Sequence, residues 1–269
     1  MQRYVDKLIS GYVALLTVAM VLPTVVVLIA SLTPREYLAF PPGGLSFRWY
    51  GAVFESGVWM SALWVSIRIA TLVTIAALLL GIPAALALRA AKSRISATLQ
   101  AVFLSPLMIP SILIGLGLLR FFDEMHVRPS VATVAIGHTL LATPYVIRYV
   151  LAGLAGVDPA LERAAGILGA GKWRTFSKVT FPLMRHGIVA GALFSFIISL
   201  DDVNIALFLS DIRVVPFSVK LMSHVEQNAD PLGAAVASVL VLIALAVLFV
   251  CDRIAGIDWM FGIKGSRHE

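Results

Sequence analysis

Charged residues and cysteine are both scarce in this chain. Of its 269 residues, only 13% are Asp, Glu, Lys or Arg, whereas 59% are hydrophobic. A soluble domain could not hide that much apolar surface, so an ordinary water-soluble fold is excluded. Cys251 is the single cysteine, and neither an internal disulfide nor a metal cluster made of cysteines can form from it.

The sequence also lacks the short motifs of several enzyme classes. It contains no H-E-x-x-H zinc pattern and no serine in a G-x-S-x-G turn. A G-x-x-x-x-G-K-[ST] phosphate loop is absent as well, so any ATP hydrolysis that serves this protein must take place on another chain. We therefore expect a protein that is not an enzyme and binds no cofactor of its own.

The apolar residues come in long blocks, and each block is long enough for a helix to cross a bilayer core of about 30 Å. The blocks are residues 11–32, 62–88, 99–119, 131–153, 187–210 and 232–251. Arg68 and Arg148 lie close enough to the ends of their blocks to reach the headgroups. We predict an all-α membrane protein with about six transmembrane helices that form a single domain over residues 1–269.

The basic residues are distributed unevenly between the predicted loops. With the N-terminus in the cytoplasm, the inner side holds Arg3, Lys7, Arg89, Lys92, Arg94, Arg163, Lys172, Arg174, Lys178, Arg185, Arg253, Lys264 and Arg267. The outer loops hold only Arg35, Arg48, Arg120, Arg128, Arg213 and Lys220. The positive-inside rule then predicts that both termini are cytoplasmic. Because basic inner loops face anionic lipid, the formal charge of +6 does not require a nucleic-acid partner.

Proline and glycine lie inside several of the hydrophobic blocks. Each proline removes a backbone donor and should bend its helix; these prolines are Pro83, Pro106, Pro110 and Pro144. Membrane helices tolerate proline, so the bends alone assign no function. Gly115 and Gly117 should let neighbouring helices approach closely.

A short helix is predicted in the loop between the fourth and fifth blocks, about residues 154–186. Asp158 is a good N-cap, and Pro159 suits the first helical position. Glu162 lies in the opening turns, where the helix dipole favours an anion. Gly169 can close the helix. A second short helix should follow over about residues 172–180 and stop before Pro182. From the residues alone, this hairpin could simply rest on lipid.

The same loop resembles the EAA motif of the permease subunits of bacterial ATP-binding-cassette importers. That motif reads E-A-A, three residues, G-A, and then F, V and L-P further on. The matching positions are Ala164, Ala165, Gly169, Ala170, Phe176, Val179 and Pro182. The motif's glutamate falls on Arg163, and the acidic residue stands one position earlier, at Glu162. The resemblance implies a coupling helix that docks on an ATPase subunit through Asp158, Glu162, Ala164, Ala165, Gly169 and Ala170.

Residues 81–88, 104–110 and 199–203 resemble the spermidine/putrescine class of these permeases. This resemblance implies an inner-membrane importer with a second permease subunit, two ATPase subunits that bind ATP and Mg²⁺, and a periplasmic substrate-binding protein. It favours a polyamine as the cationic solute, and leaves amino-acid derivatives, phosphonates and ferric iron as alternatives. An ion-driven secondary carrier is the alternative from another class, although the chain has no convincing internal repeat.

Asp201 and Asp202, with Asn204 close by, are the candidate residues of the solute pathway. An aspartate at mid-membrane costs about 2.5 to 3.5 kcal/mol, so two in succession need a compensating role. That role is either contact with a cation or capping of a break in the helix. Neighbouring residues differ by about 100° around a helix, so the pair does not suit aspartyl catalysis on one water. His138 and Asn204 could each form a hydrogen bond between helices.

Overall fold

A computed structural model describes residues 2–91, 94–155 and 157–255 of the chain. Within these ranges the regular structure is helical, apart from an isolated bridge between Asp211 and Val214. The predicted all-α fold class is therefore confirmed. Lys92, Lys264 and Arg267, which enter the charge distribution above, lie outside the described residues.

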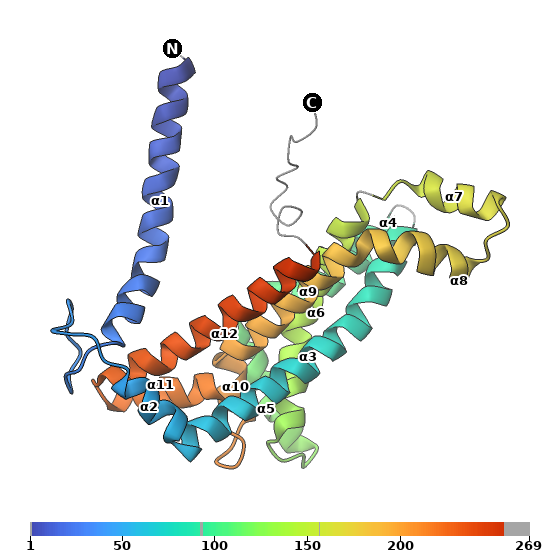
Figure 1. Ribbon diagram of the computed structural model, residues 1–269. Helices are drawn as coiled ribbons and strands as arrows, with labels where there is room; N and C mark the ends of the chain where they lie inside the picture. The colour runs from blue at the N-terminus through green and yellow to red at the C-terminus, as the bar shows by residue number, and fades with distance from the viewer. Residues whose placement is uncertain (1, 92–93, 156, 256–269) are drawn as a thin grey trace. The chain divides into compact units, whose positions relative to one another are not determined.

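Most of the predicted membrane crossings are single long helices (Figure 1). Five helices in the described ranges have the length and hydropathy to span a bilayer: α1 (Gln2–Ala30), α3 (Gly57–Ala90), α6 (Val131–Ala155), α9 (Phe181–Asp201) together with the turns before it, and α12 (Pro231–Ala255). The shorter helices are α2 (Arg48–Glu55), α7 (Pro159–Ile167), α8 (Lys172–Thr175), α10 (Asn204–Leu209) and α11 (Phe217–Gln227).

The remaining predicted block, residues 99–119, is broken at the predicted prolines, so the described residues hold five candidate crossings, or six if this bent pair is one span. Helix α4 (Arg94–Leu104) continues into a 3₁₀ turn, η1 (Ser105–Met108), and α5 (Ser111–Glu124) follows. The two parts are bent by 94° relative to each other. Pro106 lies in the 3₁₀ turn and Pro110 directly precedes α5, which confirms the bend expected there. Pro83 and Pro144, by contrast, lie inside the continuous helices α3 and α6.

The chain divides into two compact units. The first is made of Met1–Ser61 and Lys220–Leu242, and the second of Ala62–Val219 and Ile243–Glu269. In the first unit, the indole nitrogen of Trp49 donates to the carbonyl of Thr33 at 3.1 Å, and the hydroxyls of Tyr50 and Ser31 lie 2.7 Å apart. These bonds hold α2 against the end of α1. The expectation of a single domain over residues 1–269 stays a prediction.

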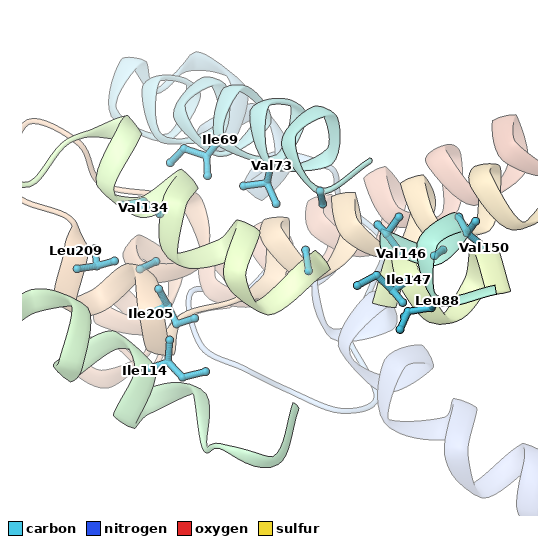
Figure 2. Close-up of a cluster of buried hydrophobic side chains, with 14 of the residues drawn as sticks. Ile69, Val73, Leu88, Ile114, Val134, Val146, Ile147, Val150, Ile205 and Leu209 are labelled. Carbon is cyan, nitrogen blue, oxygen red and sulfur yellow. The ribbon is translucent and has the colours of Figure 1, made fainter. Parts of the chain in front are cut away.

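The second unit is organised around the packing of α6 along α9. Glycine makes the close approach possible: a Cβ atom at Gly153 would lie 3.2 Å from the backbone of Gly187, and one at Gly187 would overlap the carbonyl of Tyr149. Val146 and Val150 are fully buried in the same core (Figure 2). Small residues at such a crossing bring two backbones together, so the van der Waals contact between the helices is large.

One expectation is wrong, because no separate helix ends before Pro182. Helix α8 passes into a π-helical turn, η2 (Phe176–Thr180), and then directly into α9, so Lys172–Asp201 is continuous over 30 residues. The N–H of Phe181 bonds to the carbonyl of Phe176, five residues earlier. This wider turn shifts the carbonyls that a proline ring would otherwise meet, so the helix can continue past Pro182.

Candidate functional site

Helix α7 has well-defined ends, as its sequence predicts. A carboxylate oxygen of Asp158 accepts the N–H of Ala160 at 2.8 Å, and Pro159 is the first helical residue. At the other end, Gly169 has a positive φ of 80°. The N–H of Gly169 bonds to the carbonyl of Gly166, and that of Ala170 to the carbonyl of Ala165, both at 3.0 Å. This is a Schellman closure, and it fixes where the chain turns back toward α8.

Large apolar side chains are exposed where the hairpin of α7 and α8 turns. Ile167 and Leu168 are each 87% exposed, and Trp173 is 77% exposed. We call these three residues the hairpin tip. Exposed Arg163 and Lys172 flank it, and in Figure 1 the hairpin extends past the end of α6. Clustered apolar side chains within a basic rim are typical of a protein contact surface.

The predicted contact residues on α7 do not all face the same way. Asp158, Ala164 and Gly169 are exposed, whereas Ala165 and Ala170 are half-buried. A Cβ atom at Gly166 or Gly169 would meet no other atom within 4 Å. This part of the hairpin is therefore open enough for another surface to approach the backbone, as the predicted docking requires.

Glu162 differs from these residues because its carboxylate is bound within the chain. One oxygen accepts from a guanidinium nitrogen of Arg89 at 3.1 Å and from the hydroxyl of Thr180 at 2.9 Å. The other terminal nitrogen of Arg89 donates to the carbonyl of Val157 at 3.0 Å. No sequence signal connects Arg89 to the hairpin, since it precedes Glu162 by 73 positions.

The structure separates the two neighbouring aspartates. Helix α9 ends at Asp201, and the backbone leaves the helical conformation at Asp202. A carboxylate oxygen of Asp202 accepts the N–H of Ile205, in the first turn of α10, at 2.8 Å. Asp202 therefore caps a break in the helix, which was one of the two alternatives. Asp201 is exposed and forms no ion pair with another described residue.

A buried polar cluster surrounds this break, and we define it as His138, Ser199 and Asp202. The Nδ1 atom of His138 lies 2.9 Å from the hydroxyl of Ser199, and Nε2 lies 3.3 Å from a carboxylate oxygen of Asp202. The side chains of His138 and Asp202 are 1% and 8% exposed. The hydroxyl of Ser218 also donates to the backbone carbonyl of Asp202. The bond to Ser199 confirms the interhelical hydrogen bond expected for His138. The sequence alone does not indicate which residues are its partners.

Asn204 connects the break to α5. Its amide nitrogen donates to the hydroxyl of Ser111 at 2.9 Å, which confirms the interhelical bond expected for it. A Cβ atom at Gly115 would lie 3.0 Å from the carbonyl oxygen of Asn204, whereas one at Gly117 would meet nothing within 4 Å. Of the two glycines predicted to allow close packing, Gly115 therefore does so within this chain, where α5 meets α10.

An apolar groove of about 1070 Å³ lies along α3, α4 and α6. Its lining comprises Leu72, Ala76, Leu80, Pro83, Ala84, Ala87, Val102, Phe103, Pro106, Ala132, Ala135, Ile136, Thr139, Leu140, Thr143 and Pro144. The hydroxyls of Thr139 and Thr143 both donate to carbonyls of their own helix at 2.7 Å. The groove therefore offers little to a charged solute. Asp201, Asp202 and Asn204 are not part of its lining.

Groups of residues able to hold a metal ion are not found in the described ranges, where no three His, Cys, Asp or Glu side chains converge. The two parts of the candidate site are the hairpin of α7 and α8, and the helix break at Asp202.

Comparison with known proteins gives a consistent set of relatives. Residues 77–257 match the family described as "Binding-protein-dependent transport system inner membrane component". The putrescine transport system permease protein PotI of Escherichia coli (strain K12) is 31% identical over 195 residues, which cover 70% of this chain and 69% of PotI. The putative 2-aminoethylphosphonate transport system permease protein PhnV of Salmonella typhi is 30% identical over 250 residues, covering 91% of this chain and 94% of PhnV.

Solved structures with the same fold are found as well. A chain of the bacterial alginate ABC transporter in complex with an alginate pentasaccharide-bound periplasmic protein gives a TM-score of 0.69 at 15% identity, covering 94% of this chain and 96% of that one. A chain of the MetNI methionine ABC transporter gives a TM-score of 0.63 at 18% identity, covering 74% and 97%. At these identities the likeness shows the fold alone.

Proposed function

This chain belongs to the binding-protein-dependent transport system inner membrane component family, and from that premise we propose that the solute it transports is a small cationic amine, with a polyamine such as putrescine first. The family makes it a non-catalytic, multi-pass permease subunit of an ABC importer. PotI and PhnV are named for putrescine and 2-aminoethylphosphonate, and both of these solutes carry an ammonium group.

The carboxylate of Asp201 is the observation that carries the choice of solute. It is exposed at the end of α9, while Asp202 is engaged in capping and in the buried polar cluster. A fixed negative charge near the path lowers the cost of moving a cation through a region of low dielectric constant. One such acid binds weakly enough to allow release. Asp201 is accordingly the proposed solute contact, with Asn204 supporting the break beside it.

The proposed assembly contains a second permease subunit, two ATPase subunits and a periplasmic binding protein. The periplasmic binding protein is supported by the similar alginate ABC transporter, which was solved in complex with a periplasmic protein. The exposed hairpin tip supports docking of α7 on an ATPase subunit, because Ile167 and Leu168 have no cover within their own unit. In this arrangement the hairpin and both termini are cytoplasmic, in keeping with the positive-inside rule.

Uptake of radiolabelled putrescine by the complete importer, reconstituted in proteoliposomes, tests the solute. Asp201→Asn should lower the rate roughly tenfold, which is the effect of losing one charge-assisted contact. Asp201→Glu keeps the charge and should retain most of the rate. Transport by Asp201→Asn at the parental rate would remove the physical support for a cationic solute.

The second candidate solute is 2-aminoethylphosphonate, favoured by the match to PhnV over 91% of this chain. A competition assay distinguishes the two solutes. If putrescine is the solute, an excess of unlabelled 2-aminoethylphosphonate should leave the uptake of radiolabelled putrescine unchanged. Strong inhibition by the phosphonate, together with its own ATP-dependent uptake, would assign it instead.

A further inference from the structure

We propose that Arg89 is a positioning residue that fastens α7 to the end of α3 through Glu162, so that force applied to α7 reaches the membrane helices. This inference rests on the proposed docking of α7 on an ATPase subunit. It gives Glu162 a different role from the one its motif implies, because the carboxylate binds Arg89 and Thr180 of its own chain. Arg163, at the position of the motif's glutamate, is exposed.

The guanidinium group of Arg89 donates hydrogen bonds to two acceptors at once. One terminal nitrogen donates to the carboxylate of Glu162 at 3.1 Å, and the other donates to the carbonyl of Val157 at 3.0 Å. Val157 directly precedes Asp158, the N-cap of α7. A planar guanidinium can satisfy two such acceptors at once, and a lysine ammonium could not hold the same geometry. Arg89 therefore fixes both the entry to α7 and its first turn.

Glu162 extends the connection to a third segment. The same carboxylate oxygen that accepts from Arg89 also accepts from the hydroxyl of Thr180 at 2.9 Å. Thr180 is buried at the end of the π-helical turn, just before α9. One oxygen atom therefore joins the end of α3, the first turn of α7 and the start of α9. We call this set of bonds, made by Arg89, Glu162 and Thr180, the α3–α7 latch.

Three properties of the latch and its surroundings suit it to transmit displacement. The side chains of Arg89 and Glu162 are 20% and 35% exposed, so the pair is partly shielded from water and salt, unlike an open surface pair. Helix α7 buries none of its own residues, so little apolar packing holds it to the rest of its unit. The Arg89 charge also lies in the last turn of α3, where the helix dipole favours a cation.

The connection leads into the packed part of the second unit. Leu88, next to Arg89, belongs to the buried core with Val146 and Ile147 of α6 (Figure 2). Displacing α7 would pull on Arg89 and hence on the end of α3, where the core is tightly packed. A close-packed core has low compressibility, so a shift at one of its residues displaces the neighbouring residues as well. The latch thus offers a physical route from the exposed hairpin tip to α3 and α6.

A spin label on the hairpin tip tests the latch in the assembled importer in lipid nanodiscs. The label is placed at Ile167→Cys in a Cys251→Ser background, and its mobility is read by electron paramagnetic resonance. Arg89→Ala and Glu162→Ala should each increase the mobility of the label. Arg120→Ala, which removes an exposed ion pair with Glu124 on α5, is the matched control and should leave it unchanged. Equal mobility in Arg89→Ala and Arg120→Ala would overturn the proposal.

The double variant Arg89→Ala/Glu162→Ala strengthens the test. Because the two single changes both remove the bond between Arg89 and Glu162, the effect of the double variant should be smaller than the sum of the two. Additive effects would also overturn the latch. Should Arg89→Ala prevent assembly, Arg89→Gln removes the charge with less loss of volume and serves in the same comparison.

Solute transported per ATP hydrolysed is the second measurement, made on the same variants with equal amounts of assembled complex. Loss of the latch should lower this ratio about fivefold to tenfold, as expected for a partly buried charge-assisted bond. A mobile label with an unchanged ratio would show that the latch exists but that α7 does not drive transport. That result contradicts the proposed docking function, whereas an unchanged label contradicts the latch itself.

Discussion

Removing the Asp202 side chain tests what the acidic pair contributes to the fold. Asp202→Ala deletes the acceptor for the N–H of Ile205, a bond of 2.8 Å, and the loss of such a cap typically costs about 0.5–2 kcal/mol. The same change removes the group that lies 3.3 Å from Nε2 of His138. Nε2 of His138 has no hydrogen-bond partner among the described residues even with Asp202 present, so the loss of this neighbour adds little to the loss of the cap. We therefore expect a total loss of about 0.5–2 kcal/mol, the cost of the lost cap.

Asp202→Asn provides the internal comparison for this experiment. An asparagine oxygen can still accept the N–H of Ile205, and Asn is as good a cap as Asp. Its effect on stability should therefore be clearly smaller than that of Asp202→Ala. Asp201→Ala is the external control, since the exposed Asp201 side chain has no ion pair with another described residue. Stability is measured as the thermal midpoint of the detergent-solubilised subunit by fluorescence-detected size-exclusion chromatography. A midpoint for Asp202→Ala equal to that of Asp201→Ala would refute the capping argument.

Three further predictions concern packing, turn geometry and topology. Gly187→Ala should destabilise the subunit by about 1–3 kcal/mol in a thermal assay, because the new Cβ would overlap the Tyr149 carbonyl. Gly117→Ala is the control and should be near neutral, because a Cβ there would meet nothing within 4 Å. Gly169→Ala should cost about 1 kcal/mol, because its φ is 80°, and local hydrogen exchange at the end of α7 should rise without loss of assembly. A cysteine at position 172, in a Cys251→Ser background, should resist a membrane-impermeant reagent added from the periplasmic side, and labelling there would reverse the predicted orientation.

Local signals in the sequence were sufficient for α7. Asp158, Pro159 and Gly169 act within one turn of their own positions, so the N-cap and the Schellman closure could be read directly. Block length in the same way predicted the five long helices that can cross a membrane, and a sixth crossing if the bent pair of α4 and α5 is one span. The passage of the helix through Pro182 could not be predicted, because a π-helical turn leaves no characteristic residue pattern.

Contacts between segments that are far apart in the chain could not be predicted from the sequence. His138 and Ser199 are separated by 61 positions, and Arg89 and Glu162 by 73. Residues this far apart meet only once the helices pack, and no periodicity in either segment marks the partner. The sequence therefore left open whether Asp202 caps a break or binds solute, and it assigned Glu162 to an outward contact. The packing separates Asp201 from Asp202 and pairs Glu162 with Arg89.

The π-helical turn at Phe176–Thr180 amounts to one residue inserted into an otherwise regular helix. Deleting one codon in this stretch would restore ordinary α-helical spacing. Because each residue turns a helix by about 100°, the segment before the deletion would rotate by that angle relative to α9. Trp173 and Lys172 would then point in a new direction, while the face of α9 packed on α6 would stay as it is. A family could in this way re-aim its hairpin toward a different partner with a single indel, without altering any residue of the transmembrane core.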